Sequence, residues 1–276
     1  MSAVSAVSAA PLADPLTADV SAAEADAERR FGGLRRLYGA AGYQRIRAAS
    51  VAVVGLGGVG SWAVEALARS GVRALVLIDF DHVAESNINR QVQATLRTLG
   101  MAKGEALRQR IQDIHPGCAV HLVDEFASAE NWPALLPRPV DALIDACDQG
   151  QAKLALALWA LQQGTAFVCA GAAGGKQRAQ AVELADLAEV THDPLLATLR
   201  QRLRKAGAAR QGKLGVSCVF SREAVLMPVV DACGSDAGTT TDGSLNCHGY
   251  GSSVAVTATF GMVAAGEVLR RLAAGG

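Results

Sequence analysis

The sequence predicts a doubly wound α/β domain, in which helices cover both faces of a mainly parallel sheet. Three features support this fold class: short continuous apolar runs, helical patterns that alternate with them, and a glycine-rich turn after the first run. Strands buried on both faces of a parallel sheet are typically continuous apolar runs joined by helices. The chain has 276 residues and is 50% hydrophobic, so it is long enough to bury a large core.

The first strand and the first helix frame the glycine-rich turn. Residues 51–54 form a β-branched run typical of a strand, residues 55–60 form the turn, and apolar spacing predicts a helix over 61–70. The same patterns predict strands over 74–78, 119–123, 141–145 and 166–169, a helix over 102–114, and a helix that ends at residue 161. Strands and helices therefore alternate as in a parallel sheet.

The pattern loosens after Gly171, where the sequence becomes rich in glycine and alanine. The remaining expectations are a helix over 195–205, a strand over 214–220, a mobile Gly/Ser/Thr loop over 234–253 and a C-terminal helix. The apolar run 252–266 is shorter than the roughly 18 residues that suggest a membrane span, and charged residues follow it at once. We therefore expect a buried core helix there and no membrane span.

Charge is balanced over the whole chain but unevenly distributed. The 26 basic residues match 26 acidic ones, which argues against disorder of the whole chain and against a uniformly basic nucleic-acid coat. Residues 1–28 hold five acids, no base and two prolines, are rich in alanine and serine, and lack the basic start of a secretory signal. We expect residues 1–28 to be a disordered acidic tail and the protein to be cytoplasmic.

The cysteines and histidines do not have the spacing of metal ligands. Six cysteines stand at positions 118, 147, 169, 218, 233 and 247, without a C-x-x-C pair, which argues against a structural zinc and a disulfide scaffold. Cys218 and Cys233 are candidates for covalent transfer, although a free cysteine is more often a small buried apolar residue. Cys233 is favoured of the two because it lies beside the glycine-rich loop.

The glycine-rich turn predicts a phosphate-binding site. Gly55, Gly57 and Gly60 match G-x-G-x-x-G between a strand and a helix, where backbone N–H groups and the helix dipole favour phosphate. A side chain at position 57 would hold the backbone away from the phosphate, whereas Gly60 permits close helix–strand packing. Asp79 lies 24 residues after Gly55, close to the spacing of a ribose-binding acid in Rossmann-like folds. This signature leaves NAD and ATP open, and purely structural glycines are the alternative.

Charged residues after the predicted strands favour ATP. Asp81, the run Ser86–Gln91, Lys103 and Asp148 all follow strand ends, at the sheet edge where doubly wound folds bind ligands. The two phosphates of a dinucleotide such as NAD are already bound by the glycine turn, so such a cofactor needs no additional Arg/Lys pair with a metal-holding Asp. Reaction at the α-phosphate of a triphosphate instead gains from cations on its oxygens and from a carboxylate that holds Mg²⁺. Taken one by one, these residues are equally consistent with surface ion pairs.

A basic segment lies in the second half of the chain. Residues 200–213 contain no acid and six bases: Arg200, Arg202, Arg204, Lys205, Arg210 and Lys213. A solvated helix face followed by a loop is the default interpretation. Contact with the phosphate backbone of a nucleic acid is the alternative.

Over residues 29–170 these motifs resemble the adenylation domain of the ubiquitin-activating, or ThiF-type, family. The resemblance implies ATP and Mg²⁺ as cofactors, a homodimer, ribose contact by Asp79 and a metal-holding Asp148. It also implies phosphate contacts by Asn87, Arg90 and Lys103. The full set of expected nucleotide-binding residues is Gly55, Gly57, Gly58, Gly60, Asp79, Asp81, Asn87, Arg90, Gln91 and Lys103. The residues expected to be catalytic are Arg90, Lys103, Asp148 and Arg30.

Further stretches resemble one branch of that family, the tRNA threonylcarbamoyladenosine dehydratases. These are residues 30–39, 171–176 and 212–221. The branch implies that ATP activates the carboxylate of a threonylcarbamoyl group on adenosine 37 of tRNA, after which an internal nitrogen or oxygen displaces AMP and water is lost overall. It also implies a tRNA partner for residues 200–213 and raises a cysteine desulfurase or sulfur acceptor as a further partner. We accordingly expect one domain over 29–276, with a nucleotide-binding core at 29–170 and a substrate-side extension at 171–276.

Two alternatives are weighed against this hypothesis. Enzymes of the family that activate sulfur-carrier proteins usually have two zinc-binding C-x-x-C pairs, which this chain lacks. They also place an arginine near the position of Gly33 that is thought to reach the partner's active site, and Arg30 is favoured here over Arg35 and Arg36. Adenylation of a ubiquitin-like carrier protein therefore ranks second. An NAD-dependent oxidoreductase or redox sensor would leave the charged residues at the sheet edge without a shared task.

Overall fold

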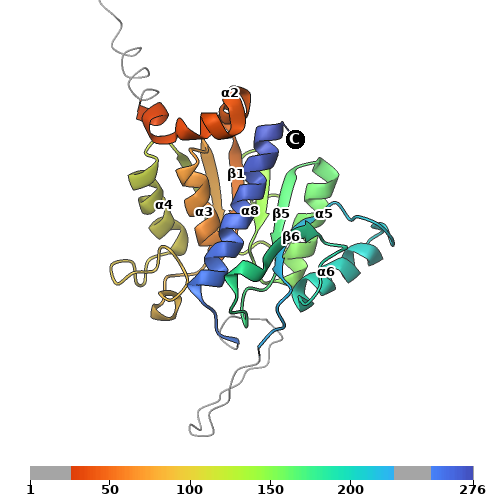
Figure 1. The fold of residues 1–276 in the computed structure, drawn as a ribbon. Helices are drawn as coiled ribbons and strands as arrows, with labels where there is room; N and C mark the ends of the chain where they lie inside the picture. Colours follow the sequence, from red (N-terminus) through yellow and green to blue (C-terminus); the bar gives the residue numbers. More distant parts are fainter. Residues whose placement is uncertain (1–25, 227–249, 276) are drawn as a thin grey trace, which may run out of the picture.

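The predicted strands form one seven-stranded sheet in the computed structural model, which describes residues 26–226 and 250–275 (Figure 1). The strands are β1 (Ser50–Val54), β2 (Ala74–Ile78), β3 (Ala119–Val123), β4 (Ala142–Asp145), β5 (Ala166–Ala170), β6 (Val182–Asp186) and β7 (Ser217–Ser221). Their order is β3-β2-β1-β4-β5-β7-β6, and every neighbouring pair is parallel except β6 with β7. The predicted mainly parallel sheet is confirmed.

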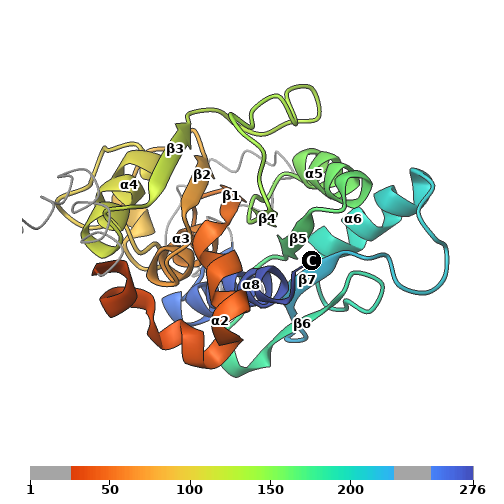
Figure 2. The ribbon, with the colours of Figure 1, turned by 90° about the horizontal axis from the view of Figure 1, so that it is seen from above.

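Helices cover both faces of this sheet, as predicted. They are α2 (Gly33–Ala48), α3 (Gly60–Arg69), α4 (Lys103–Ile114), α5 (Gly150–Gln163), α6 (Pro194–Lys205) and α8 (Val254–Ala274), with short 3₁₀ turns η1 (Glu85–Asn87) and η2 (Ala179–Ala181). Figure 2 shows α5 and α6 on one face and α3 and α8 on the other. The helices after β1 and after β4 therefore lie on opposite faces, so the gap between these adjacent strands is the switch point at which such sheets bind ligands.

Side chains of the central strands alternate between two apolar cores. Val51 and Val53 of β1 pack with α3, α4 and α8, whereas Ala52 and Val54 pack with α5 and α6. All five residues of β1 are buried, as are all five of β2. Burial on both faces explains why the apolar runs in the sequence were continuous rather than alternating.

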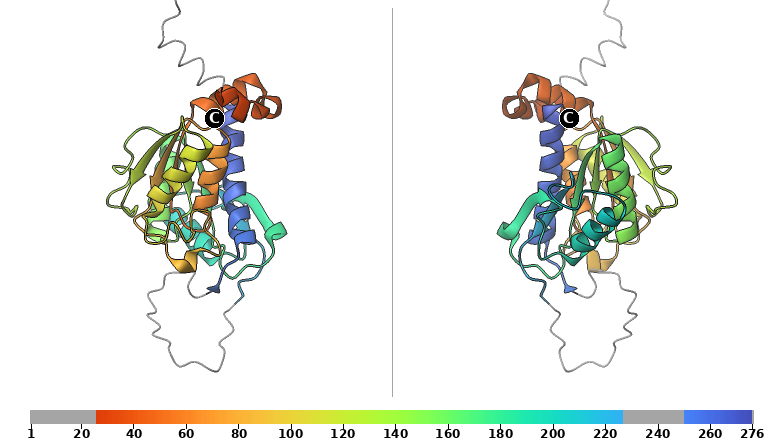
Figure 3. Two further views of the ribbon diagram at one scale, coloured as in Figure 1. Left: turned by 90° about the vertical axis from the view of Figure 1, so that its left-hand side faces the viewer. Right: turned by 90° about the vertical axis from the view of Figure 1, so that its right-hand side faces the viewer.

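The apolar C-terminal run forms α8, a core helix as predicted. Its residues Val256, Phe260 and Ala264 are fully buried against the sheet and α3. Gly261 allows the two helices to touch, because a Cβ at this position would lie 2.4 Å from the carbonyl oxygen of Val59. Figure 3 shows α8 running along one face of the molecule. No helix in the described ranges is long and apolar enough to cross a membrane.

Two elements were not predicted from the sequence. Helix α2 buries only Gly42, Tyr43 and Ile46 and is kinked at Gly39, where φ is 71°. Strand β6 pairs antiparallel at the edge of the sheet and is only partly buried. Neither element buries a continuous apolar face, so neither has the pattern on which the sequence analysis relies.

The predicted boundary of the acidic tail also differs from the structure. Residues 26–31 are helical, so the last three residues of the expected tail at 1–28 belong to a helix. The rest of that tail, and residues 234–249 of the expected mobile loop, lie outside the described residues.

Candidate functional site

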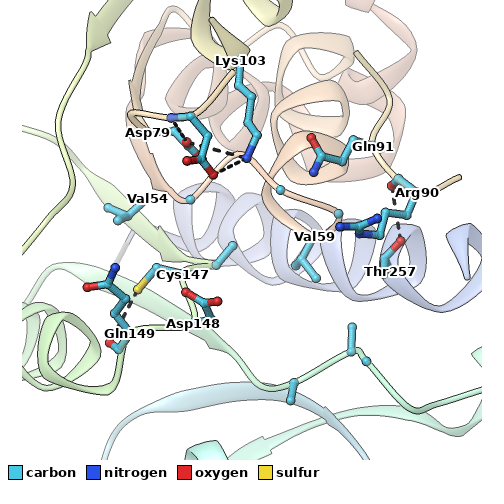
Figure 4. A pocket seen from close by; sticks show the side chains of 18 of the residues that line it. Val54, Val59, Asp79, Arg90, Gln91, Lys103, Cys147, Asp148, Gln149 and Thr257 are labelled. Atoms are coloured by element: carbon cyan, nitrogen blue, oxygen red, sulfur yellow. Dashed lines mark hydrogen bonds and ion pairs between the residues drawn. The ribbon is translucent and has the colours of Figure 1, made fainter. Parts of the chain in front are cut away.

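A cavity of about 520 Å³ lies at the carboxyl edge of the sheet, at the switch point between β1 and β4 (Figure 4). The loops that follow β1, β2, β3, β4 and β5 all contribute to its wall. Ten of the predicted site residues line it: Gly55, Gly57, Gly58, Asp79, Asp81, Asn87, Arg90, Gln91, Lys103 and Asp148. The structure therefore brings together residues that are spread over almost a hundred positions of the sequence.

The glycines of the loop after β1 have distinct structural roles. Gly55 has φ of +85°, and a Cβ there would lie 2.8 Å from the carbonyl oxygen of Ala146. A Cβ on Gly60 would lie 1.8 Å from the carbonyl oxygen of Gly55, so Gly60 serves helix–strand packing rather than the cavity wall. Gly57 faces open space, with no atom within 4 Å of an added Cβ. The backbone at Gly57 is therefore accessible to a ligand, which is the role expected of the middle glycine.

Asp79, at the end of β2, is held rigidly against the glycine loop. One carboxylate oxygen, Oδ2, accepts a hydrogen bond from the backbone N–H of Leu56 at 2.6 Å, and Oδ1 accepts one from the N–H of Asp81 at 2.8 Å. Lys103 Nζ lies 3.9 Å from Asp79 and 2.7 Å from Asp81. Burial raises the pKa of Asp79, and the Lys103 ammonium and the two backbone N–H groups oppose that rise.

Arg90 supplies a buried positive charge on the opposite side of the cavity from Asp79 (Figure 4). Its backbone carbonyl accepts hydrogen bonds from Trp62 Nε1 at 2.9 Å and Thr257 Oγ1 at 3.4 Å. Its Nη1 donates to Asn89 Oδ1 at 3.0 Å, but its Nε is buried and has no partner among the described residues. Because Arg90 lines the cavity, its guanidinium is placed to pair with a ligand that brings an anion.

Asp148 projects into the cavity from the loop between β4 and α5 (Figure 4). The loop rests on a fully buried ion pair in which Lys153 Nζ lies 3.1 Å from Asp145 Oδ2 and 2.7 Å from the carbonyl oxygen of Ala170. Burial alone would lower the pKa of Lys153, but the carboxylate of Asp145 raises it above its ordinary value. Asp145 Oδ1 also accepts from the N–H of Cys147 at 3.2 Å, which fixes the turn that carries Asp148.

Two predicted site residues, Arg30 and Cys218, lie away from this cavity. Arg30 is at the opposite edge of the sheet, where it donates to the carbonyl oxygen of Ile114 at the end of α4. Cys218 is fully buried in β7, as expected of a cysteine with a packing role. Cys233 falls outside the described residues.

The basic segment is divided in the structure. Arg200 Nη1 donates to the carbonyl oxygens of Leu187 at 3.0 Å and Val190 at 2.7 Å, so this arginine fastens α6 to the preceding loop. Arg202 is half-buried beside Gly150 at the start of α5. The other four basic side chains are exposed: Arg204, Lys205, Arg210 and Lys213.

A large part of the cavity wall is not among the site residues predicted from the sequence. This substrate half of the cavity is defined here as Gly171–Gly174, Pro194, Leu195, Val225 and Tyr250. Phe126, which follows β3 and contacts the Phe80 ring at 5.4 Å between centroids, was missed as well. Most of these residues are small or apolar and have no distinctive chemistry. The available signals were the glycine-rich composition of residues 171–176 and the family resemblance of that stretch.

Comparisons with known proteins agree with this geometry. The sequence model of the ThiF family matches residues 31–275. A tRNA threonylcarbamoyladenosine dehydratase of Escherichia coli strain K12 is 41% identical over 252 residues, which are 89% of this chain and 94% of the relative. The protein of the same name from Haemophilus influenzae is 39% identical over 249 residues, again 89% and 94% of the two chains.

A solved structure is similar over the same extent. The crystal structure of the E. coli tRNA N6-threonylcarbamoyladenosine dehydratase, TcdA, in complex with ATP has a TM-score of 0.78 and 39% identity, and the match covers 90% of this chain and 95% of that chain. The resemblance drawn from the glycine turn and the charged residues is thus confirmed over almost the whole sequence. The chain belongs to the ThiF family.

Proposed function

We propose that this protein is an ATP-dependent tRNA threonylcarbamoyladenosine dehydratase. The observation that carries the proposal is the cavity, in which a nucleotide half built from the loops after β1, β2 and β4 is continuous with the substrate half. The dehydratase relatives match both halves, because they cover residues far beyond the glycine loop. An adenylating enzyme needs such continuity, since the carboxylate must reach the α-phosphorus of bound ATP.

The proposed reaction has two steps. A carboxylate oxygen of the threonylcarbamoyl group on adenosine 37 bonds to the α-phosphorus of ATP, and pyrophosphate leaves. An internal nitrogen or oxygen of the substrate then gives up its proton and bonds to the acyl carbon, and AMP leaves with the former carboxylate oxygen. The enzyme contributes proximity and charge stabilisation, so a protein nucleophile is not needed.

Named residues divide the work of binding ATP. The backbone around Gly57 approaches the phosphates, and the carboxylate of Asp79 accepts hydrogen bonds from the ribose hydroxyls. Arg90, whose guanidinium lines the cavity, neutralises charge on the phosphate oxygens. Lys103 does the same after it exchanges the exposed carboxylate of Asp81 for a phosphate oxygen.

The structure fits a magnesium ion that is held mainly by the nucleotide. The described residues contain no group of three His, Cys, Asp or Glu side chains able to bind a metal. Mg²⁺ in nucleotide sites is commonly bound through one or two carboxylates together with substrate phosphates. Three exposed carboxylates line the cavity, and of these Asp81 pairs with Lys103, Glu125 follows β3, and Asp148 follows β4 beside the glycine loop. Asp148 would hold the ion, which neutralises the triphosphate when bound.

We further propose that tRNA lies along α6. Pro194 and Leu195 at its start line the cavity, and its end at Lys205 is about 17 Å away at 1.5 Å per residue. The exposed bases Arg204 and Lys205, with Arg210 and Lys213 beyond the helix, are placed to contact backbone phosphates while the modified base enters the cavity.

Three further expectations remain part of the proposal. A homodimer is supported by an exposed apolar stripe on α8, where Val254 is 43% and Met262 is 42% exposed. A cytoplasmic location follows from a substrate that is tRNA. A partnership with a cysteine desulfurase or sulfur acceptor is also proposed, and of the two candidate cysteines Cys233 is the one left for it, because Cys218 is fully buried.

Product analysis tests the activity. Purified protein is incubated with Mg·ATP and with tRNA that carries or lacks threonylcarbamoyladenosine. We expect release of AMP and pyrophosphate only with the modified tRNA, and a nucleoside lighter by one water on mass analysis. ATP binding without turnover of either tRNA would contradict the dehydratase function and favour activation of a carrier protein.

The variant Asp148→Asn tests the assignment of the metal-holding carboxylate. We expect its turnover to fall by about 100-fold or more and its Mg²⁺ requirement to rise, because the amide gives the ion a weaker ligand than the carboxylate. Glu189→Gln, an exposed carboxylate outside the cavity, is the control and is expected to behave as wild type. An unchanged Mg²⁺ dependence in Asp148→Asn would contradict the assignment.

A further inference from the structure

Lys176 is a buried lysine that the adenylation chemistry does not use. It lies in the glycine-rich segment after β5 and is 3% exposed. Its Nζ donates hydrogen bonds to the carbonyl oxygens of His192 at 3.1 Å, Ser221 at 3.4 Å and Glu223. The three N–H bonds of the ammonium are thus all directed at backbone oxygens. Burial lowers the pKa of this lysine, and the carboxylates of Asp193 and Glu223 oppose that shift.

The three carbonyl groups belong to two separate parts of the chain. His192 immediately precedes the capping residue of α6 and has φ of 57°, a left-handed conformation that is uncommon outside glycine. Ser221 ends β7 and Glu223 follows it. Lys176 therefore joins the β5 segment to the entrance of α6 and to the exit of β7.

These same segments lead directly into the substrate half of the cavity. Beside Lys176, the carbonyl of Gly175 accepts from the N–H of Leu226 at 2.9 Å, and the N–H of Gly175 donates to the carbonyl of Gly251 at 3.0 Å. The carboxylate of Asp193 accepts from the N–H of Ala172 at 2.8 Å and caps α6 at the N–H of Leu196 at 3.0 Å. The wall is thus built mainly from backbone whose position depends on this set of contacts.

The nucleotide half has its own supports. Asp79 is fixed by backbone N–H groups, and the loop that carries Asp148 rests on the buried pair of Asp145 and Lys153. Besides Lys103 in the cavity wall, one buried lysine lies beneath each half, Lys153 at the nucleotide side and Lys176 at the substrate side.

We propose that Lys176 is a positioning residue that sets the shape of the substrate half and so determines how the modified nucleoside of tRNA fits, without contributing to ATP binding. This inference rests on the proposed function. A buried ammonium held only by carbonyl oxygens orders the backbone around it, because each oxygen that loses its donor is left buried and unpaired.

The test compares steady-state kinetics of wild type and Lys176→Met. Methionine has a similar length and no donor. We expect KM for threonylcarbamoyladenosine-containing tRNA to rise by about tenfold or more, because unpaired buried carbonyls displace the wall. The affinity for Mg·ATP, measured by calorimetry without tRNA, should stay within about twofold, because the nucleotide half is supported separately.

Two further variants separate positioning from general damage. Lys176→Gln retains two N–H donors, should lie between wild type and Lys176→Met, and carries the test if Lys176→Met does not fold. Arg178→Met removes an exposed charge from the same segment, with a side chain that is 61% exposed, and should behave as wild type. Circular dichroism and thermal unfolding verify that each variant is folded.

The outcomes distinguish this inference from the proposed function. Wild-type protein that does not turn over modified tRNA would contradict the dehydratase function. Wild-type turnover combined with an unchanged KM for tRNA in Lys176→Met would overturn the inference alone. Equal losses of tRNA and ATP affinity would also overturn it, as would folded Lys176→Gln and Lys176→Met proteins with identical defects.

Discussion

His115, at the residue scale, is a buried histidine held in its neutral form. Its Nε2 lies 3.1 Å from Arg47 Nη1, and because a guanidinium only donates, Nε2 must be an unprotonated acceptor. Its ring also packs against the ring of Phe31 in a T-shaped arrangement, with 4.7 Å between the centroids. Burial, together with the charges of Arg47 and Arg30, lowers the pKa of His115 to about 4.

This environment predicts a pH-dependent stability. The folded pKa lies below the ordinary value, so between pH 6.5 and 4 the unfolded chain binds the proton that the folded chain excludes. The stabilisation is complete above pH 6.5 and decreases as pH falls, by about 2 kcal/mol from pH 7.5 to pH 5. Urea unfolding of wild type and His115→Gln at both pH values measures it. Equal pH dependence in the two proteins would contradict the assignment.

The predictability of site residues follows from how each one acts. Four site residues act through charged side chains and come after predicted strands: Asp79, Arg90, Lys103 and Asp148. Their position after the strands made it possible to predict from the sequence that they meet in one cavity. The substrate half acts through backbone and small side chains, and residues 171–174 have no chemistry of their own to read. Lys176 acts on carbonyl groups 16 or more positions away, a partnership that only the folded chain reveals.

At the scale of elements, β1, β2 and β4 are buried on both faces and therefore have continuous apolar sequences, from which they were predicted as strands. The sequences of β6 and α2 have no such apolar pattern. Strand β6 is antiparallel because it pairs with β7 at the edge of the sheet. The sequence of its own five residues does not show this pairing. Helix α6 was predicted from its leucines, which recur at helical spacing. It starts where Asp193 caps the helix and Pro194 stands in the first turn.

Helix α6 also carries a prediction about tRNA affinity. The double variant Arg204→Glu, Lys205→Glu reverses two exposed charges. We expect Kd for tRNA to rise by about tenfold or more, and the slope of log Kd against log salt to decrease by about one per lost phosphate contact. Filter binding over a salt series measures both quantities.

A matched control is available on other elements. The variant Arg73→Glu, Arg108→Glu makes the same charge change at exposed positions before β2 and on α4. It should leave the salt slope unchanged. Equal losses in the two double variants would mean that tRNA responds to net charge alone, and the placement of tRNA along α6 would then be wrong.

At the scale of the whole molecule, the exposed stripe of α8 predicts how copies of the chain associate. Val254, Ala258, Met262 and Gly266 follow each other at intervals of four residues, so they share one face of the helix. The opposite face is buried against α3 and the sheet, which leaves this apolar stripe on the surface. Small residues beside a methionine permit close approach of a second copy, and such a stripe on a stable protein marks an interaction surface.

The variant Met262→Lys tests that interface. A lysine at the centre of the stripe would place two ammonium groups near the twofold axis of a dimer, where burying them without partners is costly. We expect light scattering to give twice the chain mass for wild type and the single chain mass for Met262→Lys. Leu158→Lys is the control, because Leu158 is a similarly exposed apolar residue, at 39%, on the other face of the sheet. It should remain dimeric.

A monomeric wild type, or a dimeric Met262→Lys, would show that α8 is not the interface. Arg30 lies far from the cavity of its own chain, so it could be catalytic only in the cavity of a second copy. Without pairing through α8, that role for Arg30 would lose its support.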